Sequence, residues 1–254
     1  MMKNRLLTLT LIFAFANFNV QAQRISVAAA SDLKFALDSI ISVYHKQHPK
    51  NTVEVTYGSS GKFFEQIQYD APFDLYFSAD VSYPQKLKEK GLTISDVKTY
   101  GIGRIVIWSK KIDPNKDKMN SLLHPNLNKI AIANPEHAPY GERAKESMMY
   151  YKIYDKVQNK LVFGENISQT AQFVQLGAAD IGIVALSLAL SPNMKKENGN
   201  YYIIPEISHK PLEQGYVILK HAKNNTSATT FYNFIASPKA IAVLKHFGFT
   251  QKQT

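Results

Sequence analysis

Short apolar runs alternate with segments of helical spacing in the first third of the chain. Short runs of this kind, bounded by polar residues, are typical of buried strands. Between the first two runs, apolar residues recur every three or four positions, as at Leu33, Ala36, Leu37 and Ile40, which predicts a helix. Strands and helices in alternation predict a parallel α/β unit. The predicted strands are residues 24–30, 53–57 and 73–77.

A second α/β region is predicted to start at residue 104. Its helices are expected to begin at about 142 and 168, and an apolar run at 215–219 predicts a strand that returns the chain to the first region. The C-terminal part, 228–249, is predicted to be helical with a restart at Ser237-Pro238, because proline is favoured at the first position of a helix. The predicted strands of this second region are 104–108, 129–133, 161–163 and 179–186.

The first 22 residues have the layout of a secretory signal peptide. Lys3 and Arg5 precede an apolar run at 6–18, and Val20-Gln21-Ala22 offers a cleavage point between Ala22 and Gln23. A retained membrane anchor is the alternative, but a spanning helix needs about 20 apolar residues, and this run is shorter. We therefore expect export and cleavage, with a mature chain that begins at residue 23.

The amino-acid composition limits the cellular compartment and the binding partners that we expect for the protein. The chain contains no cysteine, so we expect no lipid anchor on a cysteine and no disulfide, and a free, soluble protein in the periplasm. The signal peptide carries two of the charges behind the formal net charge of +10, which leaves the mature chain at +8. A positive field concentrates anions of any kind. Because the basic residues are scattered, we expect no nucleic acid partner.

The stretch YGSSGKF (57–63) follows a predicted strand and precedes a predicted helix, which is where oxyanions often bind. A nucleotide phosphate loop requires the pattern G-x-x-x-x-G-K-[ST]. Gly58 and Gly61 are too close together for this pattern, and Phe63 stands where a hydroxyl residue must contact magnesium. The stretch is therefore not a nucleotide loop.

A secreted serine hydrolase remains an alternative. A nucleophilic serine needs a base, and His137 lies in a predicted loop, but nothing in the sequence pairs it with Ser60. The stretch also lacks the G-x-S-x-G spacing of a nucleophile elbow. The histidines are dispersed and cysteine is absent, so we expect no metal cation and no cofactor.

Small or hydroxyl residues stand at four predicted junctions between a strand and a helix. The first N–H groups of a helix lack partners inside the helix and carry the positive end of its dipole, so helix starts that converge on one point hold an oxyanion without charged side chains. Ordinary helix capping favours the same residue types, and spacing alone does not decide between the two interpretations. The junctions are at 30–32, 58–61, 139–141 and 166–168.

Six motifs, taken in order, resemble the periplasmic molybdate-binding proteins of ABC transporters over essentially the whole mature sequence. Each motif alone is weak, whereas the ordered set is specific. The motifs are AAASDL (28–33), YGSSGKF (57–63), APFDLYFSAD (71–80), ANPEHAPYG (133–141), GAADIGIVAL (177–186) and SPKAIAVLKHFGF (237–249).

The resemblance implies an α/β fold of the type II periplasmic binding proteins, with two lobes joined by a two-strand hinge. Each lobe has a mixed, mostly parallel sheet flanked by helices. Lobe 1 is expected to comprise 23–104 plus 218–254, and lobe 2 to comprise 105–217. The resemblance further implies a monomeric, non-enzymatic protein that binds molybdate or tungstate in the cleft and delivers it to a membrane permease. Sulfate or another tetrahedral oxyanion is the alternative ligand.

The resemblance also implies a set of ligand-binding residues. The first lobe is expected to contribute the Ser31 and Ser60 hydroxyls and the Asp32 N–H, and the second lobe the N–H groups of Tyr140 and Ile167. Ser59 matches a position next to the ligand rather than a ligating one. A carboxylate pointing at a dianion is unfavourable, so we expect the Asp32 side chain to point away and cap its helix.

The sequence departs from the family pattern at residue 185. Some members have a tyrosine hydroxyl there, whereas this chain has Ala185. Other members share the alanine and carry APYG in the preceding loop, as this chain does at 138–141. The missing donor is expected to be replaced by Tyr140, through its backbone or its ring hydroxyl, or by the Asp32 N–H.

Overall fold

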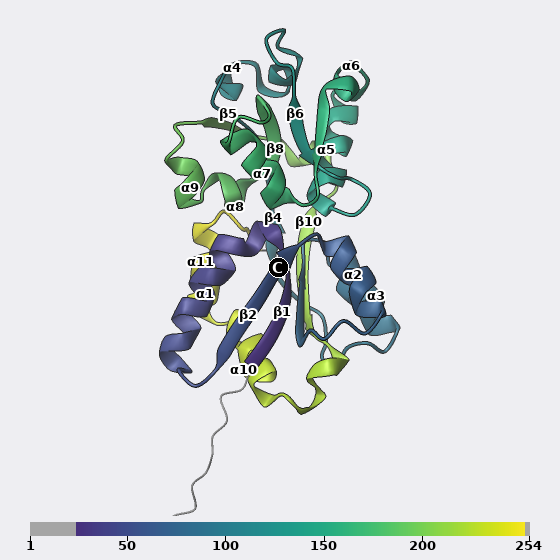
Figure 1. The fold of residues 1–254 in the computed structure, drawn as a ribbon, viewed down its shortest axis with the longest axis vertical. Helices are drawn as coiled ribbons and strands as arrows, with labels where there is room; N and C mark the ends of the chain where they lie inside the picture. The colour runs from purple at the N-terminus through teal and green to yellow at the C-terminus, as the bar shows by residue number, and fades with distance from the viewer. Residues whose placement is uncertain (1–23, 252–254) are drawn as a thin grey trace, which may run out of the picture.

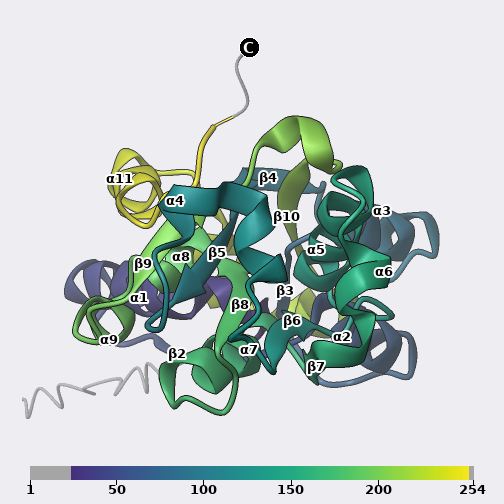
Figure 2. The same cartoon turned by 90° about the horizontal axis from the view of Figure 1, so that it is seen from above.

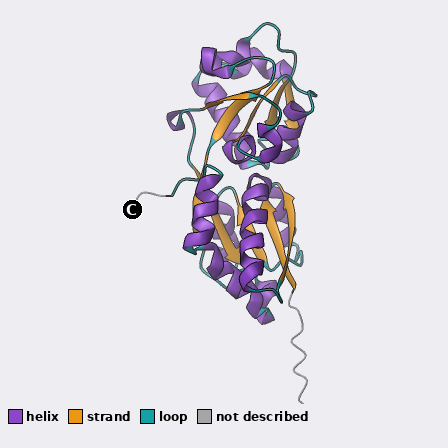
Figure 3. Cartoon of the chain, turned by 90° about the vertical axis from the view of Figure 1, so that its left-hand side faces the viewer, coloured by secondary structure: helices purple, strands orange, loops and turns teal. Residues whose placement is uncertain are grey.

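The computed structural model of the chain describes residues 24–251 and has two lobes, each built around one five-stranded sheet (Figures 1 and 3). The strand order is β2-β1-β3-β10-β4 in the first sheet and β7-β6-β8-β5-β9 in the second. In each sheet one strand, β10 or β5, runs against the other four. The two-lobed fold with mixed, mostly parallel sheets is confirmed. The predicted signal peptide lies outside the described residues.

The first lobe places helices on both faces of its sheet. Its strands are β1 (Arg24–Ala30), β2 (Thr52–Gly58), β3 (Leu75–Ser78), β4 (Lys98–Gly103) and β10 (Leu212–Ile218). Its helices are the short 3-10 turn η1 (Ser31–Leu33), α1 (Lys34–Gln47), α2 (Ser60–Gln68), α3 (Ser82–Glu89), η5 (Lys220–Asn224), α10 (Thr226–Ile235) and α11 (Pro238–His246).

Alternation along the strands sends side chains to the two faces of this sheet. Val27 and Ala29 of β1 pack with α1, α10 and α11, whereas Ala28 between them packs with α2 and α3. Seen along the long axis, α1 and α11 accordingly lie on one side of the molecule and α2 and α3 on the other (Figure 2). Both faces are apolar, which explains why the sequence shows continuous hydrophobic runs there.

The second lobe repeats the arrangement. Its strands are β5 (Ile105–Ser109), β6 (Ile130–Ala133), β7 (Leu161–Gly164), β8 (Ile181–Ala185) and β9 (Asn200–Ile203). Its longest helices are α5 (Pro139–Tyr150) and α7 (Ile167–Gln175), and both pack on β6. The shorter helices are α4 (Pro114–Asp117), η2 (Lys118–Leu123), α6 (Tyr154–Val157), η3 (Gln158–Lys160), α8 (Leu186–Ala189), α9 (Pro192–Lys195) and η4 (Glu206–Ser208).

The chain crosses between the lobes twice. It leaves the first sheet after β4 and enters β5 across Arg104, and it returns between β9 and β10. Leu212 already pairs with Gly103 of β4, so the strand pairing places the return near residue 212 rather than at the expected 218. The two crossings lie side by side at the waist of the molecule and form the hinge (Figure 1).

Several elements of the fold were not predicted, among them the helix α3, the short helices of the second lobe and the two strands β4 and β9. β4 contains Gly101 and Gly103, which weaken a strand signal, and β9 is a half-exposed strand of four residues. The two strands form because the neighbouring strands β10 and β5 offer them edges to pair with.

In both lobes the carboxyl ends of the parallel strands face the opposite lobe. The turns after β1, β2 and β3 meet those after β6 and β7 around one cavity, and Ser187 after β8 bonds to the Asp32 carbonyl oxygen. Ligands of open α/β sheets bind outside the carboxyl ends of the strands. This topology therefore directs the search for a site to the cleft. None of the helices described in 24–251 has the length and hydrophobicity to span a membrane.

Phe77 provides a test of the first core. Its ring is buried and stacks on Tyr216, with ring centres 5.1 Å apart. We expect Phe77→Ala to lower the free energy of unfolding by about 3–5 kcal/mol, because it removes a large buried side chain and leaves a cavity. Leu176→Ala, at a residue that is 80% exposed, is the control and is expected to change it by less than about 0.5 kcal/mol. Urea unfolding measures the free energy of unfolding of both variants. Equal losses in the two would contradict the packing of Phe77 in the core.

Candidate anion-binding site

One small cavity lies between the lobes, and all six residues predicted for the site line it. Ser31, Asp32, Ser59 and Ser60 come from the first lobe, and Tyr140 and Ile167 from the second. The turn after β1, the start of α2 and the starts of α5 and α7 carry these residues. The remaining lining residues are Ala30, Gly58, Ala79, Ala138, Pro139 and Asn166.

Capping does not account for the residues at the helix starts. The helix α7 is capped by a side chain, because Asn166 Oδ1 accepts from the Gln169 N–H at 3.0 Å. The residues before η1, α2 and α5, which are Ala30, Ser59 and Ala138, make no such bond. The first N–H groups of a helix have no partner within the helix. The Gly61 N–H of α2 donates to the His137 carbonyl oxygen and the Gly141 N–H of α5 to the Ala138 carbonyl oxygen, so the remaining ones are available to a group in the cavity. This favours the anion interpretation over ordinary capping.

The lining provides hydrogen-bond donors and no positive side chain. Its residues include no lysine, arginine or histidine, and Asp32 is its one acidic residue. Ser31, Ser60 and Tyr140 are each at most 2% exposed. Backbone dipoles in such a shielded place interact with a negative charge more strongly than they do in water. The cavity is thus suited to an anion without a counter-charge from the protein.

The two predicted serines are held differently. Ser60 Oγ accepts from the Ala79 N–H at 3.0 Å, which leaves the hydroxyl proton as a donor. Ser31 Oγ donates to Asn166 Oδ1 at 3.1 Å and accepts from the Ser168 N–H at 3.2 Å, so it already joins the two lobes. Asn166 and Ser168 were in a predicted junction but were not assigned to the site. Their contact with Ser31 depends on the docking of the lobes, which no local pattern encodes.

Asp32 behaves differently from the expectation. Its carboxyl does not cap the helix, but accepts from the Tyr140 hydroxyl of the other lobe at 3.0 Å through Oδ2. Its Oδ1 is buried without a hydrogen-bond partner among the described residues. Burial raises the pKa of Asp32 to about 6, against hydrogen bonding by Gln214 and Tyr140, which lowers it. The acid is therefore poised to change its charge near neutral pH.

The same contact decides how Tyr140 can act. Its ring hydroxyl donates to Asp32 and accepts from Gln214 Nε2 at 3.0 Å, and burial raises its pKa well above the usual value. A side chain at Gly103 would collide with this hydroxyl, so glycine in the hinge makes room for it. The ring hydroxyl is committed to Asp32, and only the backbone N–H of Tyr140 is left for a ligand. Gln214 was missed because it lies in a strand remote in sequence.

Residue 185 provides no hydroxyl, as the sequence indicates. Ala185 ends β8 and is fully buried beside Ile105. The next hydroxyl along the chain, that of Ser187, donates to the Asp32 carbonyl oxygen at 2.8 Å. This segment therefore contributes a bond between the lobes rather than a donor to the cavity.

The geometry does not support the Ser60–His137 pair of the hydrolase alternative. Ser60 is held by Ala79, and His137 instead contacts the adjacent Ser59. Ser59 Oγ donates to the His137 carbonyl oxygen at 2.5 Å, and the ring Nδ1 lies 3.0 Å from the same hydroxyl. The Gly61 N–H also donates to this carbonyl at 3.0 Å. Ser59 and His137 therefore hold the start of α2 against the second lobe.

Known proteins resemble the chain in sequence and in fold. Residues 25–250 match the family described as bacterial extracellular solute-binding protein. The molybdate-binding protein ModA of Rhodobacter capsulatus is 36% identical over 78% of this chain and 77% of its own length. The ModA of Azotobacter vinelandii is 33% identical over 90% of both chains.

Solved structures of binding proteins also resemble the chain in fold. The periplasmic molybdate-binding protein of Azotobacter vinelandii superimposes with a TM-score of 0.82, and the match covers 90% of this chain and all of that one. The sulfate-binding protein SubI of Mycobacterium tuberculosis superimposes with a TM-score of 0.72 over 91% of this chain and 88% of its own, but at 16% identity it shares the fold alone. The chain belongs to the bacterial extracellular solute-binding proteins, in the branch of the periplasmic molybdate-binding proteins.

Proposed function

We propose that the chain captures molybdate or tungstate between its lobes and delivers it to the membrane permease of an ABC transporter. The observation that carries this proposal is the buried cavity where four helix starts converge with no basic side chain in the lining. A fully ionised tetrahedral oxyanion matches this arrangement of donors. The relatives named as molybdate-binding proteins support the choice of anion.

The proposed donors come from both lobes. The first lobe contributes the Ser60 hydroxyl, the Asp32 N–H and the Ser31 hydroxyl, which must turn from Asn166 Oδ1 to the anion. The second lobe contributes the N–H groups of Tyr140 and Ile167. Ser59 supports the start of α2 without contacting the anion. Hydrogen bonds to an ionised group are about twice as strong as neutral ones, so a few of them hold a dianion. Because donors from both lobes are needed, binding favours the closed form.

Asp32 takes part in the proposed selectivity. Hydrogen phosphate keeps one proton at neutral pH, and a cavity of donors alone leaves that proton unpaired. An ionised Asp32 would accept it, but a dianion next to Asp32 disfavours the ionised form and keeps the acid protonated. A proton-free anion is then the ligand that leaves no donor unpaired. Sulfate is also proton-free, and the size of the cage must exclude it.

The proposed setting is the periplasm. The signal peptide at 1–22 would direct export, and without a cysteine at the mature N-terminus the protein would carry no lipid there. We propose that it works as a monomer without catalytic activity or a cofactor. Among the described residues there is no cluster of three or more histidine and acidic side chains that would hold a metal cation.

Calorimetry with four anions tests the proposal. The mature protein is titrated with molybdate, tungstate, sulfate and phosphate under the same conditions. We expect dissociation constants of about 1 μM or tighter for the first two, which corresponds to roughly 8 kcal/mol or more of binding free energy. Sulfate binding of similar strength would contradict the assignment of the anion, and failure of all four would contradict the function.

Removal of the Ser60 hydroxyl should weaken binding. Ser60→Ala deletes one hydrogen bond to a charged ligand, worth about 1.5–3 kcal/mol, so we expect a loss of affinity of roughly 10- to 100-fold. Ser39→Ala is the matched control, because the Ser39 hydroxyl donates to the Phe35 carbonyl within α1, outside the cavity. Calorimetry with molybdate compares the two variants. An unchanged affinity in Ser60→Ala would remove this residue from the site.

Affinity should depend on pH through Asp32. Its pKa is about 6 because it is buried, and a bound dianion raises the pKa further. Below about pH 6 the acid is already neutral, so affinity stays level. Above it, binding must take up a proton, so affinity falls by up to about tenfold per pH unit.

Asp32→Asn is the control for this pH dependence. Asparagine has nearly the same shape and cannot ionise, so its affinity for molybdate is expected to stay level between about pH 6 and pH 8. Calorimetry at several pH values measures both proteins. The assignment of the titrating group fails if the asparagine variant keeps the slope of the wild type.

A further inference from the structure

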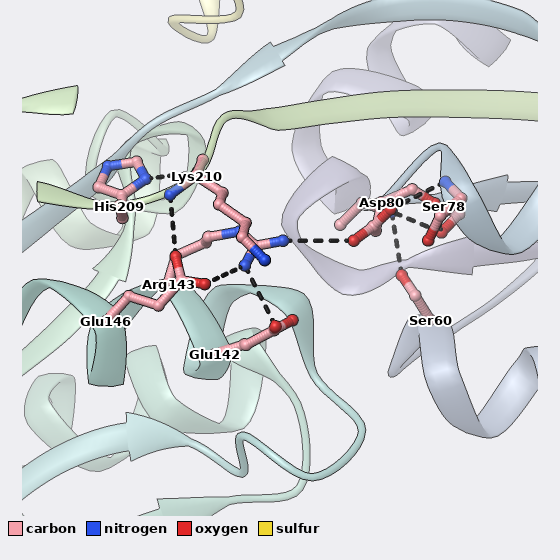
Figure 4. A network of polar contacts seen from close by, with 10 residues as sticks. Ser60, Ser78, Asp80, Glu142, Arg143, Glu146, His209 and Lys210 are labelled. Carbon is pink, nitrogen blue, oxygen red and sulfur yellow. Dashed lines mark hydrogen bonds and ion pairs between the residues drawn. The ribbon is translucent and has the colours of Figure 1, made fainter. Parts of the chain in front are cut away.

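A buried arginine lies beside the site and reaches across the cleft. Arg143, on α5 of the second lobe, has a side chain only 6% exposed. Its guanidinium bonds to Glu146 at 2.7 Å and lies 3.3 Å from Glu142, both on its own helix. It also donates to Asp80 Oδ2 of the first lobe at 3.4 Å (Figure 4). One ion pair of Arg143 therefore joins the lobes, and two lie within its own lobe.

Asp80 is fixed next to a residue of the proposed site. It follows Ala79, whose N–H donates to Ser60 Oγ. Its own N–H donates to Ser78 Oγ at 3.1 Å, and its Oδ1 accepts from the Ser82 N–H at 2.8 Å. These bonds hold the carboxylate so that Oδ2 points at Arg143 (Figure 4). The turn that carries Asp80 thus connects Ser60 with the arginine of the opposite lobe.

Arg143 is oriented by its own lobe before it meets Asp80. Glu146 binds its guanidinium through Oε1 and accepts from the Lys210 N–H through Oε2 at 2.9 Å. Because Glu146 and Lys210 both precede the return to the first sheet, these bonds are independent of how far the lobes are apart. The contact with Asp80 is the one that opening must break.

We propose that Arg143 is a positioning residue for closure: its ion pair with Asp80 forms when the lobes close and slows the release of the bound anion. The proposal rests on the proposed function, and it adds a contact that the anion itself does not touch. Opposite charges that are shielded from water attract each other more strongly than exposed ones, so separating this pair opposes opening. Contacts that only the closed complex makes change dissociation rates more than association rates.

A second ion pair across the cleft is a useful comparison. Lys62 on α2 pairs with Glu165 of the loop before α7, but their side chains are 46% and 47% exposed. Exposed pairs contribute little because water and salt screen them. Arg143 and Asp80 are better shielded, with side chains 6% and 22% exposed. The shielded pair is therefore the one expected to hold the lobes together.

Two carboxylates bound to the same arginine give a matched test. Asp80→Asn removes the charge across the cleft and keeps an oxygen for the Ser82 N–H, whereas Glu146→Gln removes a charge within the lobe. Stopped-flow mixing with molybdate measures both rate constants. We expect Asp80→Asn to raise the dissociation rate about tenfold and to leave the association rate within about twofold. Glu146→Gln keeps the Oε1 oxygen that orients Arg143, so it should change neither rate constant by more than about twofold.

Arg143→Gln completes a double-mutant cycle. It should raise the dissociation rate about as much as Asp80→Asn does, and the double variant should add little, because both remove the same contact. Equal effects of Asp80→Asn and Glu146→Gln would overturn the proposal. So would a change confined to the association rate, which would mean that Arg143 attracts the anion at long range instead of holding the lobes.

A second measurement separates failure of this proposal from failure of the proposed function. The chain has no cysteine, so Tyr69→Cys and Leu176→Cys, at exposed positions on opposite lobes, accept spin labels selectively. If the wild-type protein binds no molybdate, the proposed function fails. The distance between the two spin labels still reports how often the lobes are closed, so it tests the role of Arg143 separately. Asp80→Asn must then lower the fraction of short distances relative to wild type, and Glu146→Gln must not. Equal fractions in all three proteins overturn the role of Arg143.

Discussion

The first N–H groups of a helix have no acceptor inside the helix, and this constraint organises the whole molecule. Both sheets direct the carboxyl ends of their parallel strands at one gap, so the turns that follow place the starts of η1, α2, α5 and α7 around it. Three of these starts have no side-chain cap. Each lobe alone exposes these donors to water. The two lobes together enclose the cavity that these starts line, and a lining of donors without a basic side chain suits an anion.

Polar groups of the two lobes also form hydrogen bonds and an ion pair with each other. On the hinge side, Asp32 receives the hydroxyl of Tyr140, which in turn receives the amide of Gln214. Close to the return crossing, Arg143 meets Asp80. Both contacts bury ionisable groups, which is favourable only while their partners stay in place. The cleft therefore combines neutral donors that line the cavity with a hydrogen-bond network and an ion pair that join its two halves.

Much of the fold and of the candidate site could be predicted because the signals are local. The strand at 24–30 is seen as predicted, and YGSSGKF lies at the strand-to-helix junction where it was expected. Contacts between the lobes could not be predicted, since they join residues that lie from 63 to 155 positions apart. Asp32 was expected to cap its helix because that is its usual local role. The tyrosine that binds its carboxyl belongs to the other lobe, and the sequence does not show how the lobes dock.

A crystal structure of the mature protein with molybdate tests the central claim most directly, because molybdenum can be located by its anomalous scattering. The account predicts one molybdenum between the sheets, with its oxygens within hydrogen-bond distance of the Ser31 and Ser60 hydroxyls and of the Asp32, Tyr140 and Ile167 N–H groups. It predicts no lysine or arginine within that distance. A metal peak elsewhere, or an anion bound by basic side chains, would contradict the account.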